Sequence, residues 1–423
     1  MQLSLSTIHK TPVHFIQTDK FKRLHLSIRF FALLDEKTVT ARYLMLAMMR
    51  AKNKNFPTRK ALARHLEGLY DANYGAQATK LGRYHILQYA ITFINPAMIE
   101  SATYQKQILD FFASIIHDVA FDAQILAEEK QFLKDYFAAE YSNKTRYAAK
   151  RYYDHLYQDH PYNIHPFGIE KQIDTITLAD IEKAYHAMMT NDKIVLSLSG
   201  DFDEKSFQMD LEKRFNFSAS KLPKDFFIQH AFTKRPPIKE TLDVSQERLF
   251  MTLNTGITYG DPSYFSLVVM NAMFGESPES LLFETIREKH AMAYYVHSAY
   301  APFSGLITVS SGVKKANVEK AQSLIKTTLA AIAEGNFSDE AFSMAKNSLI
   351  IQLKQSYDSL KSLPNKGLQH VLFNLPLKKE ILLEKLNRVR KEDVIGVAGG
   401  CQWVFSYVLG GNDDEKTSLS QAE

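Results

Sequence analysis

The chain has 423 residues, a formal net charge of +4 and one cysteine, Cys401. Single hydrophobic cores stop growing near ~250–300 residues, so this length predicts two or more domains. A lone cysteine excludes a disulfide framework and any cysteine-based metal centre, and it is typical of a reducing compartment. With 51 basic against 47 acidic side chains, the charge gives little reason to expect nucleic acid as a partner.

The sequence carries no recognisable membrane or export signal. The first residues lack the basic segment and apolar run of a signal peptide. No window approaches the ~18 consecutive apolar residues of a membrane-spanning helix. We therefore expect a cytoplasmic protein that does not bind to or cross a membrane.

The first half of the chain mixes helical and strand patterns. The predicted elements are, in order, a strand at 24–31, helices at 38–50 and 59–69, a strand that begins at Tyr74, a strand over 87–93, helices that open at 95–100 and 121–123, and a strand at 196–201. Thr58 is expected to cap the helix at 59–69, because a threonine hydroxyl accepts a hydrogen bond from a backbone amide at a helix N-terminus.

The second half repeats this order. Its predicted elements are a strand at 248–253, helices at 261–273 and 279–288, a strand that begins at Tyr294, a strand at 306–309, helices that open at 314–319 and 337–339, and a strand at 406–411. Tyr74 and Tyr294 are 220 residues apart, and the other matched elements have similar offsets. A period of this length indicates a duplicated domain rather than a solenoid repeat.

The predicted fold class is α+β, with two duplicated α/β-sandwich halves. Short turns between adjacent strands favour a sheet rich in antiparallel pairs, covered by helices. The predicted boundaries are a first domain at 1–217, a linker at 218–242, a second domain at 243–412 and a polar tail at 413–423. The proline pair Pro236-Pro237 and the nearby serines and basic residues support the linker.

Several candidate sites have an ordinary structural interpretation. His155, His160 and His165 share no helical face, and we interpret them as loop histidines rather than metal ligands. Cys401 has no base beside it and is interpreted as a small buried hydrophobic residue. The basic stretch at 50–60 is interpreted as a solvated connection between helices, with nucleic-acid binding as a weak alternative.

One segment offers a more specific chemistry. Arg287 closes a predicted helix and Tyr294 begins the following strand, so the intervening turn can bring the two side chains together. A guanidinium and a phenol hydroxyl are suitable donors for a carbonyl oxygen or an oxyanion. A structural interpretation stands beside this one, because arginine stabilises helix C-termini and tyrosine favours strands.

This segment also resembles a known family. The residues IREKHAMAYYV at 286–296 are similar to the REKxGLAY segment of insulinase-type zinc metallopeptidases, which include insulin-degrading enzyme, pitrilysin and the mitochondrial processing peptidases. The duplicated halves, the linker and residues 56–62, 160–168 and 195–202 extend the resemblance along nearly the whole chain. The resemblance implies the insulinase-type (LuxS/metallopeptidase-like) fold.

The sequence departs from the family at the zinc motif. Active members carry His-x-x-Glu-His, and alignment through residues 57–62 places its two histidines and its glutamate on Tyr43, Ala47 and Leu46. The third ligand falls on Ala127, or on Glu128 after a shift of one residue. One carboxylate without the histidine pair does not hold zinc with useful affinity, so we expect this chain to bind no metal or other cofactor.

The pattern resembles the non-catalytic, YmfF-like subunits of heterodimeric bacterial members. The resemblance implies a partner paralogue that holds the zinc, and a peptide or unfolded polypeptide substrate that adds as a strand to a sheet edge. Arg287 and Tyr294 would then stabilise the substrate oxyanion in trans. By itself the chain would be a pseudo-peptidase. A scaffold or peptide-binding protein of the same fold remains the alternative, and a homodimer remains open.

Overall fold

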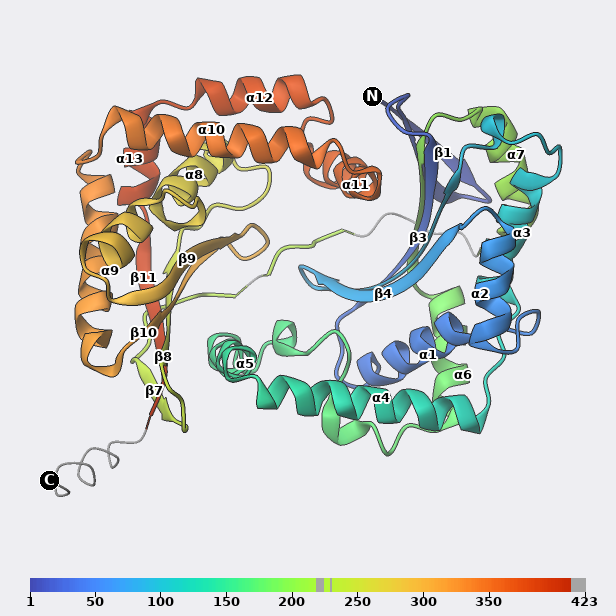
Figure 1. The fold of residues 1–423 in the computed structure, drawn as a ribbon, viewed down its shortest axis with the longest axis horizontal. Helices are drawn as coiled ribbons and strands as arrows, with labels where there is room; N and C mark the ends of the chain where they lie inside the picture. Colours follow the sequence, from blue (N-terminus) through green and yellow to red (C-terminus); the bar gives the residue numbers. More distant parts are fainter. Residues whose placement is uncertain (218–223, 229, 412–423) are drawn as a thin grey trace, which may run out of the picture. The chain divides into compact units, whose positions relative to one another are not determined.

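The computed structural model in Figure 1 describes residues 1–217, 224–228 and 230–411. Residues 218–223 and 229 of the predicted linker and the predicted tail at 413–423 lie outside the described residues. The chain forms two compact units. The first unit comprises 1–139, 161–226 and 355–378, and the second comprises 140–160, 227–354 and the chain from 379 onward. Each unit therefore includes a short segment from the opposite half of the sequence.

The first unit is built on a six-stranded sheet. Its strands are β1 (Gln2–Ile8), β2 (Thr11–Gln17), β3 (Arg23–Leu33), β4 (Asn73–Leu81), β5 (Tyr84–Ile94) and β6 (Lys193–Gly200). Their order is β1-β2-β6-β3-β5-β4, and only β2 and β6 pair in parallel. Strands β3 to β6 confirm the predicted strands of the first half, whereas the hairpin of β1 and β2 was not predicted.

One face of this sheet is apolar and carries most of the helices. Leu24, Leu26, Ile28 and Phe30 alternate along β3 and are fully buried in the first core. The covering helices are α1 (Val39–Ala51), α2 (Arg59–Gly68), α3 (Tyr104–His117), α4 (Ala123–Ser142), α6 (Leu178–Thr190) and α7 (Glu204–Arg214). The Thr58 hydroxyl accepts a hydrogen bond from the Ala61 amide at 3.0 Å, which confirms the predicted cap of α2.

The opposite face of the same sheet is polar. His25, Ser27 and Arg29 alternate with the apolar residues of β3 and are also buried. They are covered by α11 (Leu363–Phe373), a helix from the second half of the sequence. The Arg29 guanidinium donates a hydrogen bond to the Asn365 side chain at 2.6 Å. The helix is therefore attached to this face by a hydrogen bond and by a small apolar cluster that contains Ile16, Leu360 and Leu363.

The second unit has a five-stranded sheet with matching topology. Its strands are β7 (Ile238–Thr241), β8 (Glu247–Asn254), β9 (Ala293–Ala301), β10 (Leu306–Val313) and β11 (Gln402–Gly410). The order β7-β11-β8-β10-β9 corresponds to β2-β6-β3-β5-β4 of the first sheet. The parallel pair of β7 and β11 corresponds to the parallel pair of β2 and β6. This correspondence confirms the duplication. The segment that composition assigns to the linker contains β7.

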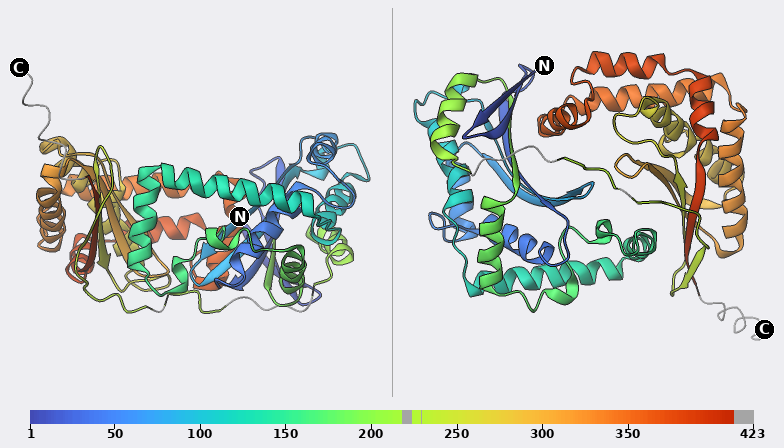
Figure 2. Two further views of the ribbon diagram at one scale, coloured as in Figure 1. Left: turned by 90° about the horizontal axis from the view of Figure 1, so that it is seen from below. Right: turned by 180° about the vertical axis from the view of Figure 1, so that it is seen from behind.

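Helices cover both faces of the second sheet as well (Figure 2). The second core contains residues of α8 (Tyr264–Asn271), α9 (Val318–Ala333), α10 (Asp339–Ser356), α12 (Lys379–Arg388) and α13 (Lys391–Gly399). On the other face, α5 (Lys144–Leu156) comes from the first half of the sequence. Its Tyr152 hydroxyl lies 2.6 Å from the Thr252 hydroxyl and 2.9 Å from the Thr308 hydroxyl.

These features confirm the predicted class, α+β with helix-covered sheets. The helix predicted at 261–273 is α8 followed by a π-helical turn at Ala272–Glu276, and the helix predicted at 279–288 ends in a second π-helical turn at Phe283–Lys289. Among the described helices, none has the length together with the apolar composition that crossing a membrane requires.

Candidate functional site

The predicted zinc positions of the first unit lie on α1. Leu46 and Ala47 are each 1% exposed, and Leu46 belongs to the first apolar core. Tyr43 is half-buried, and its ring stacks on Phe167 with a centroid distance of 4.6 Å. Burial raises the pKa of the Tyr43 phenol, so the hydroxyl remains protonated at neutral pH. The position of the catalytic base and that of the second histidine are therefore parts of a packed helix face.

A buried ion pair holds α1 from its inner side. The Arg42 guanidinium donates to both carboxylate oxygens of Asp192, at 3.1 and 2.7 Å, and both side chains are buried. A bidentate pair fixes both the position and the rotation of the helix. Residues at the zinc positions can thus change without displacing α1.

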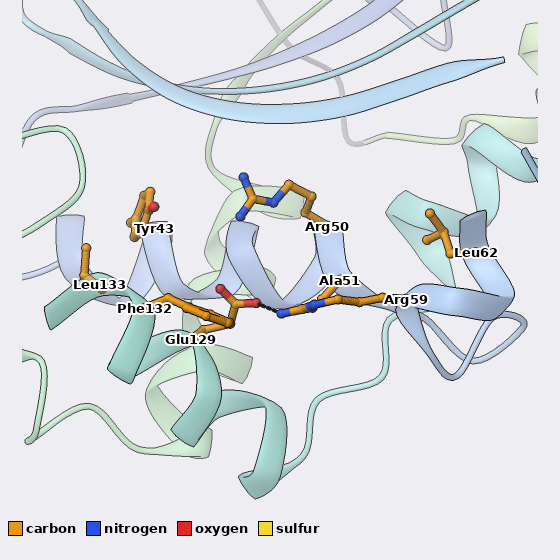
Figure 3. A pocket seen from close by; sticks show the side chains of 8 residues that line it. All are labelled: Tyr43, Arg50, Ala51, Arg59, Leu62, Glu129, Phe132 and Leu133. Carbon is orange, nitrogen blue, oxygen red and sulfur yellow. Dashed lines mark hydrogen bonds and ion pairs between the residues drawn. The ribbon is translucent and has the colours of Figure 1, made fainter. Parts of the chain in front are cut away.

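Tyr43 lines a pocket between three helices of the first unit (Figure 3). The pocket has a volume of about 360 Å³. Its wall is formed by α1, α2 and α4, and the lining residues are Tyr43, Arg50, Ala51, Arg59, Leu62, Glu129, Phe132 and Leu133. Two guanidinium groups and one carboxylate lie among them, so the pocket is polar on one side and apolar on the other.

Glu129 is the carboxylate of this pocket. Its side chain is 4% exposed and accepts a hydrogen bond from the Arg59 guanidinium at 2.5 Å. Burial raises the pKa of Glu129, while the charges of Arg59 and Arg50 oppose that shift. The carboxylate is therefore already engaged by a cation, which leaves it poorly suited to bind a metal ion.

The structure places the predicted third-ligand residues outside this pocket. Ala127 and Glu128 are exposed, whereas Glu129 faces Tyr43. Sequence reasoning missed Glu129, although a signal was available: Ile125 and Leu133 lie four residues to either side of it and are buried on the same helix face. The carboxylate nearest to the former zinc position is therefore Glu129.

The residues present do not fit a zinc ion. Tyr43, Leu46 and Ala47 provide no imidazole and no free carboxylate, and Glu129 is paired with Arg59. Throughout the part of the chain that the structure describes, no group of three or more His, Cys, Asp and Glu side chains has an arrangement that could hold a metal. Two guanidinium groups beside the site also disfavour a cation.

The predicted donor pair lies in the second unit. Arg287 belongs to the π-helical turn Phe283–Lys289, and Tyr294 lies at the start of the edge strand β9. Arg287 is exposed, and 64% of the Tyr294 surface is exposed. Neither side chain forms a hydrogen bond or ion pair with another described residue, and the Arg287 guanidinium lies 4.9 Å from the centre of the Phe283 ring.

The backbone around this pair is irregular. Tyr295 pairs with Gly312 and Ala293 with Val313, so Tyr294 is the extra residue of a β-bulge. Ala291, in the turn before the strand, has φ +47°, a left-handed conformation that disfavours a side chain. Bulges and π-helical turns redirect side chains and are frequent near functional sites. Here they keep Tyr294 directed outward from an otherwise regular strand.

The remaining candidates have structural roles. The prediction that His155 lies in a loop was wrong, because this residue belongs to α5. Its imidazole lies 2.7 Å from a Glu240 carboxylate oxygen and helps to attach the helix to the second sheet. His165 accepts a hydrogen bond from the Phe167 amide at 3.1 Å. Burial raises the pKa of the Cys401 thiol to about 11, which excludes a reactive thiolate at neutral pH.

Comparison with known proteins places these observations in a family. Residues 175–349 match the family described as Peptidase M16 inactive domain. Over 409 residues, which cover 95% of this chain and 96% of the relative, the chain is 30% identical to the probable inactive metalloprotease YmfF of Bacillus subtilis (strain 168). This chain belongs to the M16 peptidase family. The expected insulinase-type relationship is therefore confirmed, and its similarity to YmfF agrees with the lost zinc positions.

Two further proteins are similar to this chain. A conserved protein from Enterococcus faecalis V583, known from a crystal structure, has a TM-score of 0.88 and 26% identity, and the match covers 97% of this chain and 99% of that chain. The uncharacterized zinc protease YmxG of Bacillus subtilis (strain 168) is 26% identical over 55% of this chain and 56% of its own length. The relatives of this chain thus include one named as a zinc protease and one named as inactive.

Proposed function

We propose that this chain is the non-catalytic subunit of a heterodimeric M16 zinc peptidase. One observation carries the proposal: Arg287 and Tyr294 are exposed in the second unit without a hydrogen-bonded or ionic partner among the described residues, while the described part of the first unit has no group of side chains that could hold zinc. A zinc-bearing paralogue supplies the missing site, and this chain supplies the donor pair and half of the peptide chamber. By itself the chain cleaves no peptide.

The chemistry of the pair suits the proposed role. When a peptide carbonyl is attacked, its oxygen becomes an oxyanion, and donors that are already in position stabilise that charge. The partner's zinc supplies the activated water. Arg287 contributes a permanent positive charge with several N–H donors, and Tyr294 contributes one O–H donor. Because no described residue competes for these donors, both remain available to a substrate.

The edges of the two sheets support a peptide substrate. β4 ends the first sheet and β9 ends the second, and each has a strand on only one side within the described residues. An unpaired edge presents backbone N–H and C=O groups to an extended chain. Addition of a peptide strand uses those groups without regard to most side chains. The proposed substrates are therefore peptides or unfolded segments.

The names of two relatives support a pair of one inactive and one zinc-bearing chain. Bacillus subtilis has one relative that is named a probable inactive metalloprotease and another that is named a zinc protease. Similar chains with and without a zinc site thus occur in one bacterium. We place the proposed heterodimer in the cytoplasm, a setting that suits the single thiol of Cys401.

Co-expression with an M16 paralogue of the same organism that carries His-x-x-Glu-His tests the proposal. We expect a stable heterodimer with one zinc ion, and peptidase activity that neither chain shows alone. A partner with its motif glutamate changed to glutamine is the control, because it should assemble and remain inactive. Full activity of the paralogue alone contradicts the proposal. Recovery of this chain only as a monomer or homodimer also contradicts it, and favours a scaffold.

A further inference from the structure

The pocket beside Tyr43 contains one arginine, Arg50, whose side chain binds no other residue in the described part of the chain. Arg50 lies in the last turn of α1 and is exposed, and its side chain forms no hydrogen bond or ion pair with another described residue. Arg59, in contrast, binds Glu129 and lies 5.8 Å from the centre of the Phe132 ring. The pocket therefore has two arginines with different roles.

The charge of Arg50 is directed into the pocket region. Tyr43 and Arg50 are seven residues apart, so they share one face of α1. Figure 3 shows their side chains on the same side of that helix. Burial raises the pKa values of Tyr43, Tyr74 and Glu129, and the positive charge of Arg50 opposes each of these shifts.

The charges in the pocket do not balance. Arg59 and Glu129 neutralise each other, which leaves the charge of Arg50 in excess. A guanidinium presents a planar set of N–H donors that matches a carboxylate. Partial enclosure strengthens such a contact, because fewer water molecules screen it. The most suitable ligand is therefore a singly charged anion.

The remaining wall of the pocket is apolar. Leu62, Leu133 and Phe132 line it, and Phe132 is 59% exposed although it is a large hydrophobic residue. The volume of about 360 Å³ is near the lower end of the range for ligand pockets, enough for a small part of a peptide. The helix α1, which carries Arg50, packs against the edge strand β4, so a peptide on that edge passes near the pocket.

We propose that the pocket beside Tyr43 is a carboxylate-binding pocket, in which Arg50 holds a carboxylate of a bound peptide and the apolar wall contacts the neighbouring atoms. The carboxylate belongs either to an acidic side chain or to the C-terminus. The peptide as occupant rests on the proposed function, whereas the preference for a carboxylate depends only on this chain. The pocket thereby selects substrates without taking part in cleavage.

Binding to the isolated chain tests this proposal. The probes are four fluorescent peptides of one sequence that carry either Glu or Gln at a central position and either a free or an amidated C-terminus. We expect removal of the bound carboxylate to raise the Kd about ten- to hundredfold, the range for a hydrogen-bonded charge. Loss on the change to Gln identifies a side chain, and loss on amidation identifies the terminus.

Two variants establish where the carboxylate binds. Arg50→Gln should abolish the difference between the probes, while Lys54→Gln, which removes an equal charge from an exposed position nearby, should preserve it. Both variants change exposed side chains, and equal melting temperatures will show that they fold. Equal binding of all four probes overturns the proposal, as does equal weakening by both variants. Neither result affects the heterodimer test, so the two proposals can fail separately.

Discussion

The two units share a sheet topology, but their predicted site residues are placed in opposite ways. In the first unit, Leu46 and Ala47, at the predicted zinc-motif positions, are packed into the protein interior. In the second unit, Arg287 and Tyr294 lie on irregular backbone and contribute no hydrogen bond or ion pair to the described structure. A duplicated fold can therefore lose chemistry in one half, because the apolar core and not the site maintains each sheet.

The units also differ in how they bind the helix that each takes from the opposite half of the sequence. In the first unit, α11 covers buried histidines and Arg29, whereas in the second unit α5 is attached through Tyr152 and an ion pair between Arg151 and Glu240. Buried imidazoles and a paired carboxylate respond to acid at different pH values. We therefore expect the two units to lose stability in different pH ranges.

The largest expected effect is therefore that acid unfolds the first unit before the second. Burial lowers the pKa values of His14 and His25 to about 4, with Arg29 adding to the shift, and burial together with Arg42 lowers that of His85 to about 3. Because these pKa values lie below the usual 6.5, the histidines of the unfolded chain take up protons at a higher pH than those of the folded chain. The stability of the first unit thus falls as the pH decreases from about 6.5 to about 3, by several kcal/mol in total.

The second unit should resist until lower pH. Hydrogen bonds from Arg151, His155 and Tyr407 lower the pKa of Glu240 to about 2, from its usual 4.5. Its contribution is complete above about pH 4.5 and is lost as pH falls toward 2. Hydrogen exchange measured by mass spectrometry across a pH series resolves the units. Simultaneous loss of protection in both units contradicts the predicted separation.

Alanine substitutions should show that Leu46 stabilises the fold, whereas Arg287 does not. Leu46→Ala removes a fully buried side chain, and we expect a loss of about 2–5 kcal/mol in the free energy of unfolding. Arg287→Ala should change that free energy by no more than about 0.5 kcal/mol, because the side chain is exposed and has no ionic partner. Chemical denaturation measures both. Similar costs for both variants contradict the division into a structural and a functional position.

A smaller effect should identify strain beside the retained pair. Ala291 has φ +47°, a left-handed conformation that glycine adopts without strain. Ala291→Gly should therefore raise the free energy of unfolding by about 1 kcal/mol and raise the melting temperature. The matched control is Ala330→Gly on the exposed face of α9, where the same chemical change should cost about 1 kcal/mol. Destabilisation by both changes contradicts strain at Ala291.

Much of the fold was predictable because local patterns determine it. The helix predicted at 38–50 is α1 at Val39–Ala51, since its apolar residues and the following turn mark both ends. The hairpin of β1 and β2 was missed because its turn has His9 and Lys10 at φ 47° and 68°, positions where glycine or asparagine is the usual signal. The exchange of α5 and α11 could not be predicted, because an amphipathic pattern does not specify which sheet a helix covers.

The candidate sites were predictable to a different degree. The sequence predicts the loss of the zinc motif and the pair Arg287 and Tyr294 through the resemblance of residues 57–62 and 286–296 to the family. The pocket of Arg50 and Glu129 does not, because it requires α1, α2 and α4 to come together in three dimensions. The bulge at Tyr294 likewise depends on the register between β9 and β10, which the sequence of one strand does not determine.

The turnover of the assembled heterodimer with Tyr294→Phe tests the central claim most directly. The change removes only a hydroxyl from a side chain that is 64% exposed, so folding and the partner's zinc content should remain the same. We predict a kcat about 10²–10³ times lower, the effect of removing one oxyanion donor. Tyr295→Phe, at the next residue of the strand, is the matched control and should retain normal turnover. An unchanged kcat for Tyr294→Phe in a correctly assembled complex would contradict the claim that this chain supplies a donor to the reaction.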